Sequence, residues 1–153
     1  MPSEFDLLLR VLLAAVLGGA IGFDREIRRK PAGMRTHMLV AVGSALFYAA
    51  GVLILGEATG TQFTGDVLRV PAAIVTGVGF LGAGAILRAG DRVTGLTTAA
   101  GIWVVAAIGL LAGAGFVILA VGGTVLVLLI VNILSWIYDR FLVTEETDGA
   151  EPV

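Results

Sequence analysis

The side chains with the most evident chemistry lie in one short charged segment, Asp24 to Arg35. This segment holds five of the ten basic residues of the chain, and two acids stand among them. Guanidinium and carboxylate groups this close in sequence predict an ion-pair network at a surface. The candidate functional residues here are Asp24, Arg25, Glu26, Arg28, Arg29, Arg35 and Thr36.

Two interpretations of this charged segment remain open. In one, its basic residues only fix the membrane topology and touch anionic lipid headgroups. In the other, the mixed charges build a docking or gating surface at the membrane face. The sequence gives the two interpretations about equal support.

The side chains that enzymes use for covalent catalysis form no evident set. The serines are scattered, the single histidine, His37, has no evident nucleophile beside it, and cysteine is absent. Because such catalysis needs a nucleophile next to a base, the sequence predicts no enzyme. It also predicts no metal site and no cofactor, and a net charge of -2 gives no reason to expect nucleic acid as a partner.

The composition predicts an all-α membrane protein with the lipid bilayer as its solvent. Hydrophobic residues make up 58% of the chain, charged residues only 14%, and the mean hydropathy is +0.99. Soluble domains are about a quarter charged. The apolar runs predict five transmembrane helices near 4–23, 36–55, 68–87, 96–112 and 116–137, in a domain of residues 1–140 that precedes a disordered, acidic, cytoplasmic tail at 141–153.

The last apolar stretch, Gly95 to Ile137, is too long to be one straight helix across a membrane. At 1.5 Å per residue it would measure about 60 Å, against a hydrocarbon core of about 30 Å. The small residues at 112–115 are the expected corner.

The basic residues predict the orientation. If the segment 24–35 is cytoplasmic, only Arg10 and Arg69 of the ten basic residues lie outside, so the positive-inside rule places the N-terminus outside and the C-terminus inside.

Small and polar residues within the apolar runs are candidates for helix packing or for the lining of a pathway. Gly18 and Gly22 recur on one helix face, which predicts close packing. A GxGxxG spacing in the third run lacks the strand that a dinucleotide fold requires. The full set of candidates is Gly18, Gly22, Arg69, Gly77, Gly79, Gly82, Gly84, Thr97, Thr98 and Trp103. Trp103 is expected to pack between helices.

Three blocks carry a resemblance to a known family. They read GGAIGFDREIRRKPAGMRTHMLVAVGSALF, TGVGFLGAGAILR and VTGLTTAAGIWVVAAIGLLAGAG. In this order they resemble the MgtC/SapB family. The resemblance implies a bacterial inner-membrane protein with about five helices, linked to growth in low magnesium, to stress adaptation and to survival inside macrophages. It carries over Asp24, Arg25, Glu26, Pro31, Gly33, Arg35, Thr36, Arg69, Gly77, Gly79, Gly82, Gly84, Thr97, Thr98 and Trp103.

Two departures from the family pattern accompany this resemblance. Ala73 stands where many members have glutamine. Longer members carry a soluble C-terminal domain, and this chain is expected to be a short member without it.

Two functions are therefore expected as alternatives. The first is a non-enzymatic regulator of magnesium or ion homeostasis that acts on another membrane complex, by resemblance the ATP synthase or a cation transporter. The second is a small transporter or channel, which would need a homo-oligomer because one short chain has few helices to enclose a pathway.

Overall fold

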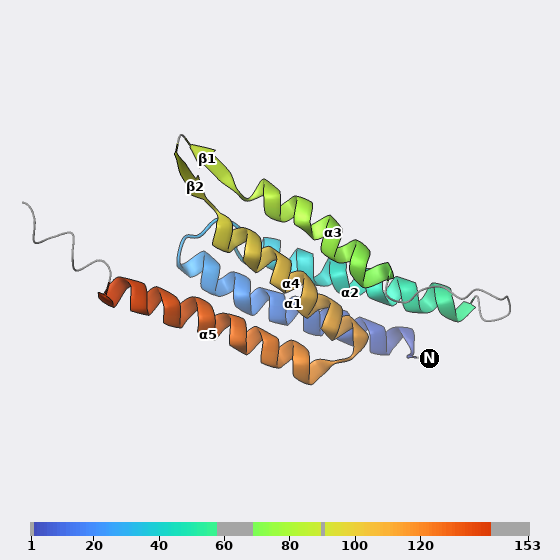
Figure 1. Ribbon diagram of the computed structural model, residues 1–153. Coiled ribbons are helices and arrows are strands. Elements are labelled where there is room, and N and C mark those ends of the chain that lie inside the picture. The colour runs from blue at the N-terminus through green and yellow to red at the C-terminus, as the bar shows by residue number, and fades with distance from the viewer. Residues whose placement is uncertain (1, 58–68, 90, 142–153) are drawn as a thin grey trace, which may run out of the picture.

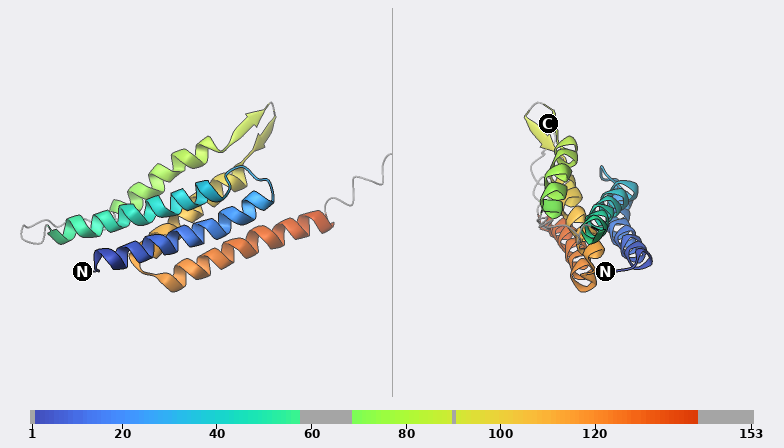
Figure 2. Two further views of the ribbon diagram at one scale, coloured as in Figure 1. Left: turned by 180° about the vertical axis from the view of Figure 1, so that it is seen from behind. Right: turned by 90° about the vertical axis from the view of Figure 1, so that its right-hand side faces the viewer.

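The computed structural model describes residues 2–57, 69–89 and 91–141, and these residues form five helices and a small hairpin (Figure 1). Successive helices run in opposite directions along one long axis (Figure 2). The predicted all-α fold with five helices is confirmed. In chain order the elements are α1 (Glu4–Ile27), α2 (Met34–Glu57), α3 (Arg69–Gly84), β1 (Leu87–Ala89), β2 (Arg92–Thr94), α4 (Leu96–Ala114) and α5 (Val117–Phe141).

Four of these helices are long and apolar enough to cross a bilayer, within Glu4–Ile27, Met34–Ile54, Leu96–Ala114 and Val117–Ile137. The third, α3, is apolar but has only 16 residues. Such a helix rises about 24 Å, which is less than the roughly 30 Å of a hydrocarbon core. The hairpin β1–β2 follows at its C-terminal end (Figure 1).

The third helix ends at Gly84, three residues before its predicted end. The N–H groups of Ala85 and Ile86 turn back to the carbonyls of Gly82 and Ala83. The chain then enters the antiparallel pair β1–β2, in which Leu87 lies opposite Thr94. Strands of three residues carry too little periodicity to be recognised from the sequence, which predicted a helix up to residue 87.

The corner between the last two helices falls at Gly115, inside the predicted patch 112–115. Gly115 adopts φ +87°, and its N–H bonds back to the Ala112 carbonyl, while Phe116 bonds to the Leu111 carbonyl. This left-handed C-terminal turn is available to glycine without steric strain. The single apolar stretch therefore divides into two antiparallel helices.

The centre of the molecule is α4, which contacts all four other helices. Its closest partners are α1 and α2, and the shared core consists largely of small side chains, such as the fully buried Ala14, Ala41, Ala45 and Ala112. Small residues let helix backbones approach closely, which replaces the hydrophobic driving force that is missing in lipid. α3 and α5 lie along the flanks of α4 (Figures 1 and 2).

One end of the bundle gathers most of the polar chemistry. The α1–α2 connection, the β hairpin and the C-terminal end of α5 all lie there, and the N-terminus lies at the other end (Figure 1). Apart from Phe141, which ends α5, the predicted acidic tail lies outside the described residues.

Candidate functional site

Half of the charged segment is helix, because it includes the last turn of α1 and the first residues of α2. Asp24, Arg25 and Glu26 lie in the last turn of α1, which continues to Ile27, and only residues 28–33 connect it to α2. Two residues of this connection, Arg29 and Ala32, adopt left-handed conformations with φ near 52° and 56°. The tight connection holds the charged side chains in fixed and separate directions.

Arg25 points into the bundle. Its side chain is only 4% exposed, and its Nη2 donates a hydrogen bond of 2.5 Å to Thr98 Oγ1 in the first turn of α4. Its buried Nε has no hydrogen-bond partner. A buried guanidinium with a free N–H is costly unless something accepts from it, so this group marks the site.

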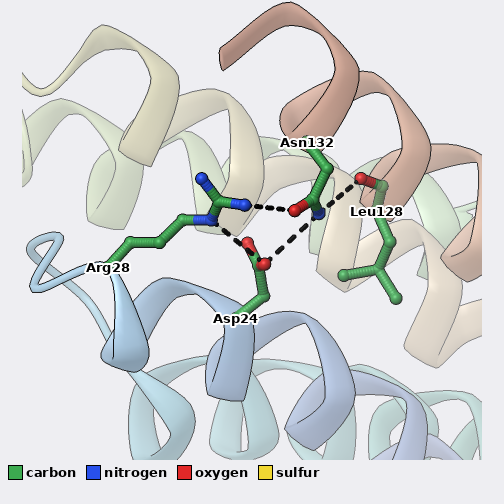
Figure 3. Close-up of polar contacts among 4 residues, drawn as sticks. All are labelled: Asp24, Arg28, Leu128 and Asn132. Carbon is green, nitrogen blue, oxygen red and sulfur yellow. Dashed lines mark hydrogen bonds and ion pairs between the residues drawn. The ribbon is translucent and has the colours of Figure 1, made fainter. Parts of the chain in front are cut away.

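Asp24 and Arg28 join α1 to α5 through Asn132 (Figure 3). Arg28 Nε lies 3.2 Å from Asp24 Oδ1, and Arg28 Nη2 donates to Asn132 Oδ1. Asn132 Nδ2 donates both to Asp24 Oδ1, at 3.2 Å, and to the Leu128 carbonyl, at 2.8 Å. The amide therefore uses its acceptor and both donor directions to hold the flanking helix α5 against α1.

Glu26 closes the start of the next helix. Its Oε2 accepts a hydrogen bond of 2.8 Å from the N–H of Met34, the first residue of α2. A carboxylate at a helix N-terminus satisfies an otherwise unpaired donor and opposes the positive end of the helix dipole. Glu26 is therefore committed to the turn between α1 and α2.

His37 is fully buried where α1, α2 and α4 meet. Its Nδ1 lies 2.9 Å from the Gly33 carbonyl, which can only accept, so the proton of the neutral ring sits on Nδ1. Nε2 is then a bare acceptor, and it has no partner. It faces Gly101, where a Cβ would lie 3.5 Å away.

Two hollows open around the charged segment. The smaller, about 400 Å³, lies on its outer side and is lined by Glu26, Arg29, Lys30, Gly33, Arg35 and Thr36. The larger, about 1200 Å³, is a cleft between the C-terminal end of α3 near the hairpin, the start of α4 and the C-terminal half of α5. Its basic and hydroxyl-bearing lining residues are Arg25, Arg28, Lys30, Thr36, Thr94, Thr97, Thr98 and Ser135.

The structure separates the predicted glycines into two groups. Gly18 and Gly22 lie against α2, where a Cβ on Gly22 would approach the Met34 Cα to 2.5 Å. Gly82 lies near Ala99 of α4. The other three predicted glycines of α3, Gly77, Gly79 and Gly84, have open space where a Cβ would be.

The remaining predicted residues lie apart from one another. Thr97 and Thr98 open α4 and line the large cleft. Arg69 is exposed at the start of α3, far from the charged segment along that helix. Trp103 does not pack between helices as expected, because 47% of it is exposed on α4.

Sequence reasoning did not identify Asn132 or His37 as site residues. Asn132 offered a signal, since it is a polar side chain within an apolar run of α5, where such residues usually have a partner. His37 directly follows Arg35 and Thr36, so its sequence neighbours did not set it apart. Among the residues that the structure describes, no three His, Asp or Glu side chains group closely enough to hold a metal ion.

Comparisons with known proteins agree with this membrane bundle. The MgtC family profile matches residues 11–140. The chain is 43% identical over 143 residues to the Escherichia coli (strain K12) protein named "Putative magnesium transporter YhiD", covering 93% of this chain and 66% of that protein.

Two further relatives have similar identities over shorter segments. Protein MgtC of Brucella abortus (strain 2308) is 47% identical over 115 residues, which is 75% of this chain and 45% of that protein. An uncharacterised Synechocystis protein, slr0014, is 46% identical over 121 residues, 79% of this chain and 49% of its own length. The chain thus spans about half to two thirds of these relatives. No solved structure matches it significantly. The match over most of its length shows that the chain belongs to the MgtC family.

Proposed function

We propose that this chain is a multi-pass protein of the bacterial inner membrane that regulates magnesium or cation homeostasis without being an enzyme. The family match and the name of the YhiD relative support the link to magnesium. In this proposal the chain acts on another membrane complex, such as a cation transporter or the ATP synthase, and supports adaptation to low magnesium and stress.

The proposed orientation places the charged end of the bundle in the cytoplasm. That end carries the segment 24–35, the hairpin and the last turn of α5, and with them eight of the ten basic residues. The excess of Lys and Arg on one side determines orientation during insertion. A cysteine in place of Lys30 should resist an impermeant thiol reagent in intact cells, whereas one in place of Arg69 should react.

The feature that supports the proposal is a net basic face, because the lining of the small hollow has three cations and the single acid Glu26. Arg29, Lys30 and Arg35 surround the small hollow and are exposed, and they form no ion pair among the described residues. The neighbouring acids are already engaged, Asp24 with Arg28 and Glu26 with the Met34 N–H. The acids of this segment therefore fix the scaffold, while three cations remain available to an acidic surface of a partner.

Charge reversal on this face tests the proposal. The double variant Arg29→Glu/Lys30→Glu should reduce recovery of the partner complex from detergent-solubilised membranes by about tenfold or more, because like charges then meet across the interface. Arg69→Glu, at the opposite end of the bundle, is the matched control and should recover the partner normally. Equal recovery with both variants would contradict a docking role for this face.

A second candidate is a homo-oligomeric transporter or channel. It is favoured by three glycines of α3 that have open space, Gly77 and Gly84 on one helix face and Gly79 on another, where a second copy could approach. The large cleft does not suit a pathway for cations, because the basic side chains of Arg25, Arg28 and Lys30 line it and would repel them. Robust Mg²⁺ flux into liposomes that contain only the purified protein would favour this second function over regulation.

A further inference from the structure

The large cleft combines polar and apolar surfaces. Its floor is polar and its side walls are apolar. The walls come from two helices that flank α4, with Leu81 on α3 and Ile130 and Leu134 on α5. Each of these three side chains is about half exposed.

The floor of the cleft contains the positive end of a helix. α4 begins after Gly95, which has no side chain to accept hydrogen bonds from the first-turn N–H groups. These donors have no partner within the helix itself and point along its axis. The start of a helix therefore attracts anions, above all phosphate groups.

The buried arginine is the second and independent sign of a ligand. Arg25 lines the cleft, is 4% exposed and leaves its Nε–H without an acceptor. Its Nη2 already binds the Thr98 hydroxyl, so the guanidinium sits directly at the first turn of α4. An anion there would receive hydrogen bonds from both the guanidinium and the helix end.

The charges that line the cleft also favour an anionic occupant. Arg28 and Lys30 stand on the rim, and none of the described lining residues is acidic. An occupant of this cleft must therefore be negative at the floor. It must also be apolar where it passes between Leu81 and Leu134. A small hydrophilic anion has no such apolar part and therefore fits the cleft less well than an amphipathic one.

We propose that the cleft binds one anionic phospholipid. Its phosphate lies at Arg25 and the N-terminal turn of α4, and its acyl chains lie between α3 and α5. Lys30 and Thr36 line both this cleft and the small outer hollow, whereas Arg25 lines only the cleft, and Arg29 and Arg35 line only the outer hollow. The lipid site does not depend on the regulatory role proposed above.

Native mass spectrometry of the purified full-length protein tests the proposal. After exchange into detergent with phosphatidylglycerol or phosphatidylcholine, one phosphatidylglycerol should remain bound at a collision energy that removes phosphatidylcholine. Arg25→Gln should weaken this retention by about tenfold or more, the effect of losing a charged hydrogen-bond donor. Arg69→Gln, an exposed arginine at the other end, should retain the lipid.

A second variant protects the test against misfolding of the first. Leu134→Trp fills the cleft from an exposed position without touching a charge, and it should also lose the lipid while the protein stays monodisperse. Equal retention of the two lipids, or retention by Leu134→Trp, would overturn the proposal. Displacement by millimolar inorganic phosphate with no preference between the lipids would assign the site to a free anion, and a dimer that shields the cleft would assign it to a second copy. Either outcome also overturns it.

Discussion

Glycine has two different roles in this bundle. Where α4 packs against α1 and α2 it allows the helix backbones to approach closely, and on α3 it leaves part of the helix surface uncovered. At Gly109 of α4 a Cβ would lie 2.3 Å from the Ala41 carbonyl oxygen, so no side chain fits. At Gly79 of α3 a Cβ would meet nothing within 4 Å. Glycine in a membrane helix therefore marks either a contact already made within the chain or a face left free.

The two flanking helices also differ from each other. α5 is tied to α1 by the polar group of Asp24, Arg28 and Asn132, although only 11% of the residues in its most apolar stretch are buried. α3 packs through a small apolar cluster with α4 that includes Ile74, Val78 and Ile102. We expect the packing of α4 against α1 and α2 to contribute most to stability, the attachment of α5 less, and the exposed side of α3 least. The following predictions are given in that order.

The largest effect is expected from Gly109→Ala. The added methyl group would overlap backbone atoms of Ala41, which cannot rotate away, so α2 and α4 must separate. We expect a loss of about 3 kcal/mol or more in the free energy of unfolding. Reversible unfolding of the protein in mixed micelles measures it, and a loss below about 1 kcal/mol would show that the crossing is looser than described.

A medium effect is expected from Asn132→Leu. The substitution keeps the size of the side chain but removes its contacts with Asp24, Arg28 and the Leu128 carbonyl. The free energy of unfolding should fall by about 1–2 kcal/mol, because a charged pair loses its shared partner. Ser135→Leu, one turn away on the same helix, is the control, since no hydrogen bond links Ser135 to α1 in the described part of the chain.

The smallest effect is expected from Gly79→Ala. The position is open, and alanine favours a helix over glycine, so stability should stay level or rise by up to about 1 kcal/mol. The same unfolding experiment applies, now compared with Gly109→Ala in a neighbouring helix. A clear loss of stability, together with a smaller particle in detergent, would mean that another copy covers this face.

Much of the architecture could be predicted because lipid imposes it. The apolar runs, the turn at Gly115 and the basic excess of one end follow from hydropathy, glycine chemistry and charge. The end of α1 was misplaced because Asp24, Arg25 and Glu26 were taken as loop residues. In the structure their side chains find partners while the backbone stays helical.

The site itself could be predicted only in part. The charged segment was visible, but the partners of its side chains come from positions about 70 to 110 residues later, such as Thr98 and Asn132. Nothing local in the sequence distinguishes Arg25, which points inward, from Arg29, which points outward. That difference follows from helical phase and from a tight turn whose conformation is set by tertiary contacts.

One crosslinking experiment in living cells tests directly whether the basic end of the bundle contacts a partner protein. A photoreactive amino acid is placed at Lys30, on the basic face, or at Phe80, which is 82% exposed on the open face of α3. We expect adducts with a different membrane protein from position 30, and we expect these adducts to disappear when Arg29→Glu is added. Adducts from position 80 to a second copy, with none from position 30, would contradict this expectation.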